Sequence, residues 1–305
     1  MMMNEPRQFE ALRGTLTRGA PLARYTSWRC GGPGDRVYVP ADRDDLAVFV
    51  RQLPKDEPLT VIGLGSNLLI RDGGVRGTVV VLHAALNALE LRESLIHAEA
   101  GVASPKVARF AARHNRTGAE FLAGIPGTIG GALAMNAGCY GGETWRFVTR
   151  VEVLTAAGTF EQRAPSAYAI GYRTVRCADG RVPDGIFVAA WFDFPPGDGF
   201  AASEQIRALL QRRIATQPLD LPNAGSVFRN PEGDHAARLI ETCGLKGYAV
   251  GGARVSEKHA NFIVNPRATA KAADIEAIIA HVRATVHERT GIELETEVRV
   301  IGEPR

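Results

Sequence analysis

The sequence has few of the residues that build metal sites or disulfide frameworks. Its 305 residues include only four cysteines, Cys30, Cys139, Cys177 and Cys243, and no two of them form a Cys-x-x-Cys pair. None of the seven histidines has a metal-ligand spacing such as His-Glu-x-x-His. Isolated cysteines are typical of reduced thiols in a cytosol, so we expect a cytoplasmic protein without a metal.

Long apolar runs and an excess of one charge are also absent. No apolar segment approaches the roughly 20 residues of a membrane-spanning helix, and residues 1–6 lead into polar sequence instead of the apolar part of a secretion signal. The formal net charge is +3, without the basic stripe or aromatic ladder of nucleic-acid-binding proteins. We therefore expect no membrane span, no secretion signal and no nucleic acid partner. A mildly basic chain favours the approach of an anionic small molecule.

Glycine is abundant, and its densest stretch runs from Gly124 to Gly131 and on through residues 136–143. Each glycine costs roughly 0.5–1 kcal/mol against alanine in a regular helix or strand, so this density predicts close backbone approach to another group. The stretch leads into the apolar helical run 131–135. A turn of N–H groups that ends in a helix N-terminus is typical of a phosphate site, and we therefore predict that this stretch binds a diphosphate.

A second glycine loop, residues 63–68, follows a strand-like segment over 59–62. No lysine follows Gly130 or Gly131, which excludes the P-loop of NTP hydrolysis for the main loop. Leu68 occupies the place of the third glycine of a Rossmann fingerprint, so the second loop is not a standard dinucleotide site. Two loops of different types predict one long ligand with two phosphates, and two ordinary turns are the alternative.

The hydrophobic pattern predicts alternating helices and strands in two or three domains. Helices are expected after the caps Asp42, Ser104 and Thr269, and an alternating strand is expected over 292–301. Further expected elements are a hairpin around 156–158, a helix with Ile206, Leu209, Leu210 and Ile214 on one face, a domain boundary at 195–199 and a functional loop over 221–231. Arg173, in a loop-like and aromatic-flanked segment, is either a solvated surface residue or a carboxylate-binding residue.

Together these stretches resemble the UDP-N-acetylenolpyruvoylglucosamine reductase (MurB) family of flavoenzymes. The resemblance runs from Tyr25 to Glu303 and rests on five separated motifs in the same order. It implies an α+β chain with a two-subdomain FAD-binding fold of the PCMH/vanillyl-alcohol-oxidase type and a C-terminal α+β substrate-binding domain. The expected ranges are 1–90 and 91–200 for the two FAD-binding subdomains and 201–305 for the substrate-binding domain.

The resemblance assigns both glycine loops to the diphosphate of FAD. Related oxidases often carry a histidine in the loop that corresponds to residues 63–68, and this histidine bonds covalently to the flavin. This chain has Gly65-Ser66-Asn67 there, so non-covalent FAD is expected. The cofactor-binding residues implied are Gly63, Gly65, Ser66, Asn67, Leu68, Gly124, Ile125, Pro126, Gly127, Thr128, Gly130, Gly131, Asn136 and Gly138.

The implied reaction is the NADPH-dependent reduction of UDP-N-acetylglucosamine enolpyruvate to UDP-N-acetylmuramate, a step of peptidoglycan precursor synthesis. Flavin N5 would give hydride to the terminal methylene carbon, and the neighbouring carbon would become an enolate-like centre that needs charge stabilisation and a proton. By the resemblance, Arg173 pairs with the enolpyruvyl carboxylate, Ser226 donates the proton and Glu297 assists at the same centre. The resemblance also implies substrate contacts for Asn230, which matches a substrate-contacting Asn, and for Tyr172 and Arg229.

Some members of the family insert a long tyrosine-bearing loop after the Tyr-Arg motif. Here only residues 177–185 separate that segment from the next expected strand, so the chain resembles the shorter type. We expect a monomer. The alternative function is an FAD-dependent oxidase of the same cofactor-binding fold, against which the missing loop histidine and the motifs around Ser226 and Glu297 count. A nucleotide-binding module without activity is a further alternative, which the three filled catalytic positions disfavour.

Overall fold

The computed structural model describes residues 9–305, and the expectation about a secretion signal in residues 1–6 lies outside the described residues. The chain forms two compact units. Unit 1 comprises the chain up to Thr17, Arg36–Gly63 and Gly77–Arg207, and unit 2 comprises Arg18–Asp35, Leu64–Arg76 and Ala208–Arg305. The division at residues 90 and 200 stays a prediction.

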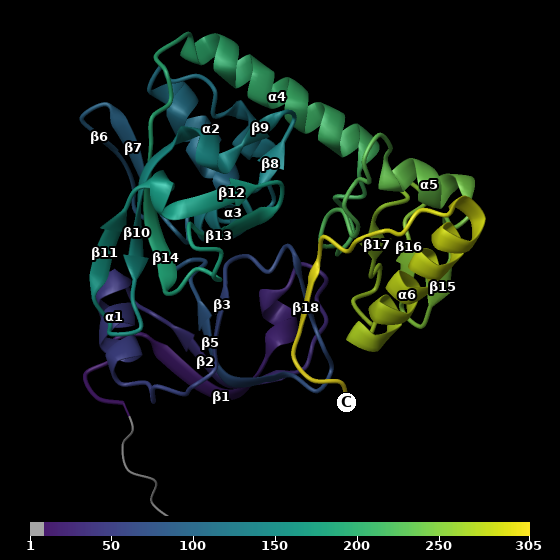
Figure 1. The fold of residues 1–305 in the computed structure, drawn as a ribbon, viewed down its shortest axis with the longest axis horizontal. Coiled ribbons are helices and arrows are strands. Elements are labelled where there is room, and N and C mark those ends of the chain that lie inside the picture. The colour runs from purple at the N-terminus through teal and green to yellow at the C-terminus, as the bar shows by residue number, and fades with distance from the viewer. Residues whose placement is uncertain (1–8) are drawn as a thin grey trace, which may run out of the picture. The chain divides into compact units, whose positions relative to one another are not determined.

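Unit 1 contains a five-stranded antiparallel sheet (Figure 1). In sheet order its strands are β11 (Phe160–Arg163), β10 (Val148–Leu154), β14 (Ile186–Phe192), β7 (Leu95–Glu99) and β6 (Leu89–Arg92). The predicted hairpin is confirmed, because Leu154 of β10 pairs with Phe160 of β11. Helix α3 (Ile129–Met135) packs against β14 and β7, which places the main glycine stretch beside this sheet.

A second sheet has the strand order β1-β2-β5-β3. Its strands are β1 (Thr15–Pro21), β2 (Pro33–Val39), β5 (Val75–Val81) and β3 (Leu59–Ile62), and β3 runs parallel to β5. Helix α1 (Arg43–Arg51) follows β2, and the predicted cap is confirmed because the Asp42 carboxylate accepts the Asp45 N–H at 2.9 Å. The shorter elements are η1 (Leu22–Tyr25), η2 (Glu120–Gly124), β8 (Gly138–Cys139), β9 (Gly142–Glu143), η3 (Thr144–Phe147), η4 (Pro165–Ala167), β12 (Tyr168–Gly171) and β13 (Thr174–Cys177).

Helix α2 (Ser104–Arg113) begins one residue before the predicted start. Ala103 is the N-cap residue, and Ser104 is the first helical residue instead of the cap. The Ser104 N–H donates to Gly127 O at 2.9 Å, so the backbone of the main glycine stretch satisfies one of the N–H groups that have no partner within the helix.

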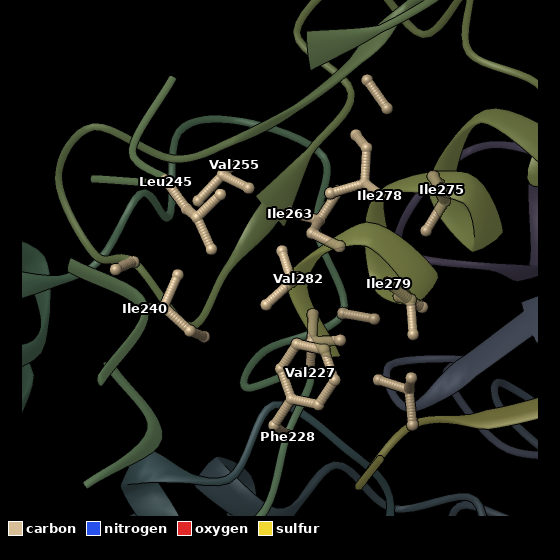
Figure 2. Packing of buried hydrophobic residues seen from close by; sticks show 14 of the residues in the cluster. Val227, Phe228, Ile240, Leu245, Val255, Ile263, Ile275, Ile278, Ile279 and Val282 are labelled. Atoms are coloured by element: carbon tan, nitrogen blue, oxygen red, sulfur yellow. The ribbon is translucent and has the colours of Figure 1, made fainter. Parts of the chain in front are cut away.

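Unit 2 has its core between helix α6 (Ala272–Thr290) and a three-stranded sheet. The sheet consists of β15 (Ala249–Val250), β16 (Ala253–Val255) and β17 (Ile263–Val264), and α5 (Ala236–Thr242) packs on α6. The predicted apolar face of α6 is confirmed as buried: Ile275, Ile278, Ile279, Val282 and Val286. Figure 2 shows four of these residues packed with Val255, Ile263, Val227 and Phe228.

The predicted Thr269 cap of α6 is wrong. Lys271 is the N-cap residue, and the carboxylate of Asp72 accepts the N–H groups of Ala272 and Ala273 at 3.0 Å each. A carboxylate at a helix N-terminus satisfies orphan donors and interacts favourably with the helix dipole. The cap comes from a residue 200 positions away in the chain, which local sequence patterns do not indicate.

Two predicted elements differ from the structure, one in the burial of its apolar face and one in its length. The expected helix is α4 (Gly199–Thr216), but of its expected apolar face only Ile206 is buried, and Ile214 is 61% exposed. The expected strand over 292–301 is reduced to β18 (Arg299–Ile301), which pairs in parallel with β4 (Leu68–Ile70). The rest of that segment is irregular apart from a single bridge between Thr296 and Phe228. The alternation of apolar and charged residues over 292–301 therefore predicted a longer strand than the structure contains.

Over residues 9–305, no helix is both long and apolar enough to cross a bilayer. In the same range, no group of three or more His, Cys, Asp and Glu side chains is placed to hold a metal ion.

A buried histidine lies at the centre of the unit 1 sheet. His97 of β7 is 2% exposed, pairs with Trp191 of β14 and has its ring centroid 4.6 Å from that of Trp191. Neither ring nitrogen has a hydrogen-bond partner among the described residues. Burial, and after it the positive charge of Arg92, lowers the His97 pKa from 6.5 to about 4.

We expect His97 to make folding sensitive to acid. Below pH 6.5 the unfolded chain binds a proton at this position, whereas the folded chain does not until about pH 4, so stability is lost as the pH falls through this window. Between pH 7 and pH 5 the loss amounts to about 2 kcal/mol. Urea unfolding at both pH values should show that His97→Leu loses less stability than wild type, while the exposed His114→Leu behaves like wild type. Equal losses in wild type and His97→Leu would contradict this expectation.

Candidate active site

The Tyr-Arg motif forms the turn of a β-hairpin in unit 1. Strands β12 and β13 pair from Tyr168 with Cys177 to Gly171 with Thr174, so Tyr172 and Arg173 are the two turn residues. The segment is thus a hairpin, not the open loop that the sequence indicated. Arg173 has φ of 54°, which is uncommon for a residue other than glycine. Such strained positions cost about 1–3 kcal/mol and cluster at functional sites.

The Arg173 side chain lies against the main glycine stretch. Its Nη2 donates to Gly138 O at 2.9 Å, and its Cζ lies 5.0 Å from the centroid of the Tyr172 ring. A guanidinium held by a carbonyl on one side and an aromatic ring on the other has a defined orientation. Its planar set of donors matches the geometry of a carboxylate, so the carboxylate-binding interpretation is favoured over a solvated surface residue.

Asn136 connects the same stretch to the hairpin. It is 1% exposed, and its Nδ2 donates to Glu143 Oε2 at 3.0 Å and to Gly171 O at 3.1 Å. Its Oδ1 accepts the Trp145 N–H at 3.2 Å. A carboxamide has two N–H donors, and both are used within the protein. The assignment of the Asn136 side chain to the cofactor stays a prediction, but its donors serve the fold.

The N-terminus of α3 offers fewer amides than the sequence indicated. The Ile129 N–H donates to Val102 O and the Gly130 N–H donates to Ala100 O, both at 2.9 Å. Two of the first three amides of the helix are thus paired with protein carbonyls. The expectation that this helix start points several donors at a phosphate is wrong for these two, and Gly131 is the first-turn residue that can offer its amide.

Most glycines of the two loops are required by the chain's own packing. A Cβ on Gly124 would lie 2.6 Å from Cys139 Sγ, one on Gly130 would lie 3.0 Å from the Ala100 Cβ, and one on Gly138 would lie 2.6 Å from Gly142 O. In unit 2, Gly65 has φ of 64°, and a Cβ there would lie 2.0 Å from Tyr25 O. The glycine density therefore has an internal cause at these positions. At Gly131 the space is open, because a Cβ would meet only Thr128 Oγ1, at 3.9 Å.

Two buried hydroxyls beside the main glycine stretch have no partner among the described residues. Thr128 is 1% exposed and Ser104 is 0% exposed, and the Oγ1 and Oγ atoms make no hydrogen bond. Thr128 Oγ1 lies next to Gly63, where a Cβ would approach it to 2.4 Å. A buried hydroxyl without a partner costs about 1–3 kcal/mol, so Thr128 fits a ligand that brings acceptor oxygens. Sequence reasoning treated Ser104 only as a helix cap and missed its unpartnered hydroxyl.

In unit 2, Ser226 lies in the irregular segment 221–231, as predicted. Gly225 before it has φ of 73°, and Val227 and Phe228 after it are 0% and 2% exposed. The segment was predicted as a functional loop, and Val227 and Phe228 also belong to the core of unit 2. Ser226 therefore stands between a glycine in open space and two anchored residues.

Asn261 fixes the backbone that follows Ser226. Its Oδ1 accepts the Phe228 N–H at 2.9 Å, and its Nδ2 donates to Phe228 O at 2.8 Å. Its own carbonyl accepts the Val227 N–H at 2.9 Å. Asn261 is 3% exposed and was not among the predicted site residues. A polar side chain at the start of an apolar strand was the only signal in the sequence.

Glu297 is attached on both sides. Its N–H donates to Val227 O at 2.8 Å, next to Ser226, and its carbonyl accepts Asn67 Nδ2 at 3.1 Å. Asn67 O in turn accepts the Arg299 N–H at 3.0 Å. The structure therefore brings three predicted site residues of unit 2 onto adjacent backbone segments: Asn67, Ser226 and Glu297. Arg173 lies in unit 1.

Arg229 and Asn230, which the resemblance assigns to the substrate, also contact other residues of unit 2. The Arg229 N–H donates to Glu295 O at 2.9 Å, and Arg229 Nη1 lies 3.4 Å from Glu295 Oε2. Burial, together with the nearby Arg229 guanidinium, lowers the pKa of Arg299. Asn230 Oδ1 accepts the Ala236 N–H at 3.2 Å at the start of α5. Two guanidinium groups whose charges interact favour an anionic ligand.

Comparison with known proteins identifies the class. Residues 34–162 match the family model of an FAD binding domain, and residues 217–301 match the C-terminal domain of UDP-N-acetylenolpyruvoylglucosamine reductase. This combination defines an FAD-containing oxidoreductase.

Relatives over the whole length identify the family. The UDP-N-acetylenolpyruvoylglucosamine reductase of Nitrosospira multiformis is 55% identical, covering 97% of this chain and 91% of its own, and that of Methylococcus capsulatus is 56% identical, covering 95% and 94%. The crystal structure of the reductase (MurB) from Thermus caldophilus is 31% identical, with a TM-score of 0.79 over 95% of this chain and 99% of its own. The chain belongs to the UDP-N-acetylenolpyruvoylglucosamine reductase family, and the α+β fold expected from the resemblance is confirmed.

Proposed function

We propose that this protein reduces UDP-N-acetylglucosamine enolpyruvate to UDP-N-acetylmuramate with NADPH, by way of non-covalent FAD. The observation that carries the proposal is that Glu297 is hydrogen-bonded to both Val227 and Asn67. These bonds link the segment of Ser226 to the glycine loop over residues 63–68. The family match over nearly the whole chain supports the same reaction. The proposed place of action is the cytoplasm, in the synthesis of peptidoglycan precursors, and the proposed form is a monomer.

The residues present fit FAD. In unit 1, the unpartnered Thr128 hydroxyl and the open face of Gly131 suit the oxygens of a diphosphate. In unit 2, the carbonyls of Gly65 and Asn67 accept protein N–H groups, which fixes the backbone on both sides of Ser66. FAD supplies the hydride when it is bound and reduced by NADPH.

The protein's own residues would then handle charge and protons. Arg173 pairs with the enolpyruvyl carboxylate, where negative charge grows as hydride arrives. Ser226 donates a proton to the carbon beside that carboxylate, and Glu297 supports the hydroxyl as the proton leaves. Tyr172, Arg229 and Asn230 are the proposed further contacts of the sugar nucleotide.

An anaerobic visible spectrum of the purified protein tests this proposal. We expect an oxidised flavin band that bleaches with NADPH and returns on addition of UDP-N-acetylglucosamine enolpyruvate. Bleaching that this substrate does not reverse, together with rapid aerobic turnover of a sugar alcohol or phenol without NADPH, would replace the proposal by the oxidase alternative. No flavin band after reconstitution with FAD would contradict both.

A further inference from the structure

Two segments of unit 1 exchange hydrogen bonds in a reciprocal arrangement. The Asn136 side chain donates to Gly171 O at 3.1 Å, and the Arg173 side chain donates to Gly138 O at 2.9 Å. In each segment the two participating residues are two positions apart. The hairpin turn and the main glycine stretch thus each donate one hydrogen bond to the other. On the hairpin side the two bonds involve Gly171 and Arg173.

From this arrangement we infer that Asn136 is a positioning residue, which holds the Tyr172-Arg173 turn so that the guanidinium can receive a carboxylate. The inference rests on the proposed role of Arg173. It gives the Asn136 side chain a function other than cofactor contact, because both Nδ2 hydrogens go to Glu143 and Gly171.

The backbone at both ends of the network is constrained. Asn136 is the C-cap of α3 with φ of 41°, and Arg173 has φ of 54°. Asparagine adopts the left-handed region more readily than most residues, and its carboxamide can bond locally from there. A non-glycine residue stays in this region at Arg173 only where its surroundings hold it, and the Asn136 bond to Gly171 lies directly before the turn.

Glu143 sets the orientation of the Asn136 carboxamide. Its carboxylate accepts from Nδ2 and cannot donate, whereas the Trp145 N–H can only donate and is accepted by Oδ1. These two partners distinguish the nitrogen from the oxygen, so the second Nδ2 hydrogen is directed at Gly171 O. Aspartate would fit the shape of the site but would lose both donors and face the Glu143 carboxylate.

Asn136→Gly removes the side chain and keeps the left-handed backbone accessible. Asn115→Gly is the matched control, because Asn115 also has a positive φ, of 53°, and is exposed at the end of α2. Amide hydrogen exchange over residues 168–177 of the FAD-loaded protein measures the hairpin directly. We expect Asn136→Gly to speed exchange there by about tenfold and Asn115→Gly to leave it unchanged, in line with loss of one hydrogen bond that holds the turn.

Steady-state kinetics provide the second measurement. We expect Asn136→Gly to raise KM for UDP-N-acetylglucosamine enolpyruvate by about tenfold, while flavin content and the rate of flavin reduction by NADPH stay within about twofold of wild type. Asn136→Asp should have a larger effect on the same KM.

Two results would overturn the inference. Loss of FAD with an unchanged hairpin would make Asn136 a cofactor ligand. Unchanged amide exchange in both glycine variants would show that Asn136 does not hold the hairpin. If wild type itself does not turn over this substrate, the proposed function fails, whereas hydrogen exchange still decides whether Asn136 holds the hairpin.

Discussion

Ser226→Ala should leave flavin reduction by NADPH nearly intact and slow flavin reoxidation by UDP-N-acetylglucosamine enolpyruvate by about 10²–10⁴-fold, the range typical of losing a general acid. The proton is needed only after hydride has reached the substrate, so only the second half-reaction depends on this hydroxyl. Alanine fits the backbone at this position, because the anchoring contacts belong to Val227 and Phe228 and to Asn261 that clamps them. Anaerobic stopped-flow absorbance measures both half-reactions separately.

Ser203→Ala is a matched control for this experiment. Ser203 lies on α4, and its hydroxyl donates to Gly199 O at 2.8 Å within the helix, so its loss should change neither half-reaction. Equal slowing of both half-reactions in Ser226→Ala would show that Ser226 is structural. In that case the clamp that Asn261 forms on Phe228, and not the hydroxyl, would be the important feature of this segment.

Local patterns predicted the fold where the determining contacts are close in sequence. The apolar face of α6 and the Asp42 cap of α1 are confirmed because spacing within a helix and the first-turn hydrogen bond are local properties. The α6 cap was wrong because Asp72 supplies it from a distant part of the chain. The length of β18 was wrong because strand pairing depends on a partner, and only residues 299–301 have one in β4.

The same distinction explains the site predictions. The resemblance assigned Ser226 and Glu297 to the substrate-binding domain and Asn67 to the first FAD-binding subdomain. The structure places all three in unit 2, where hydrogen bonds link Glu297 to Val227 and to Asn67. Sequence alone could not show that Asn261 clamps Phe228, since the partners are 33 residues apart. It also could not distinguish glycines that avoid the protein's own atoms, such as Gly124, from one with open space, such as Gly131. The number of glycines in a segment does not separate these two kinds of glycine.

Arg173→Lys should reduce turnover of the enolpyruvyl sugar by about 10²–10³-fold, comparable to removing one donor from an oxyanion site. In the structure Nη2 of the guanidinium donates to Gly138 O, and a guanidinium pairs with a carboxylate through two parallel N–H bonds. An ammonium is a single point of charge on a flexible stem, so it cannot keep the Gly138 bond and also form a bidentate pair. The loss should appear in kcat and kcat/KM together, because the charge that Arg173 stabilises is largest in the transition state.

Arg176→Lys separates this effect from a general effect of replacing a guanidinium by an ammonium on this hairpin. Arg176 lies on β13 of the same hairpin, is exposed and donates to Gly180 O at 3.5 Å, so this variant should keep wild-type rates. Amide exchange over residues 168–177 should be similar in both variants, because Asn136 continues to hold Gly171 O. If Arg173→Lys turns over the enolpyruvyl sugar at the wild-type rate, Arg173 does not act on the carboxylate. Its strained turn would then serve only the packing of the hairpin against Gly138.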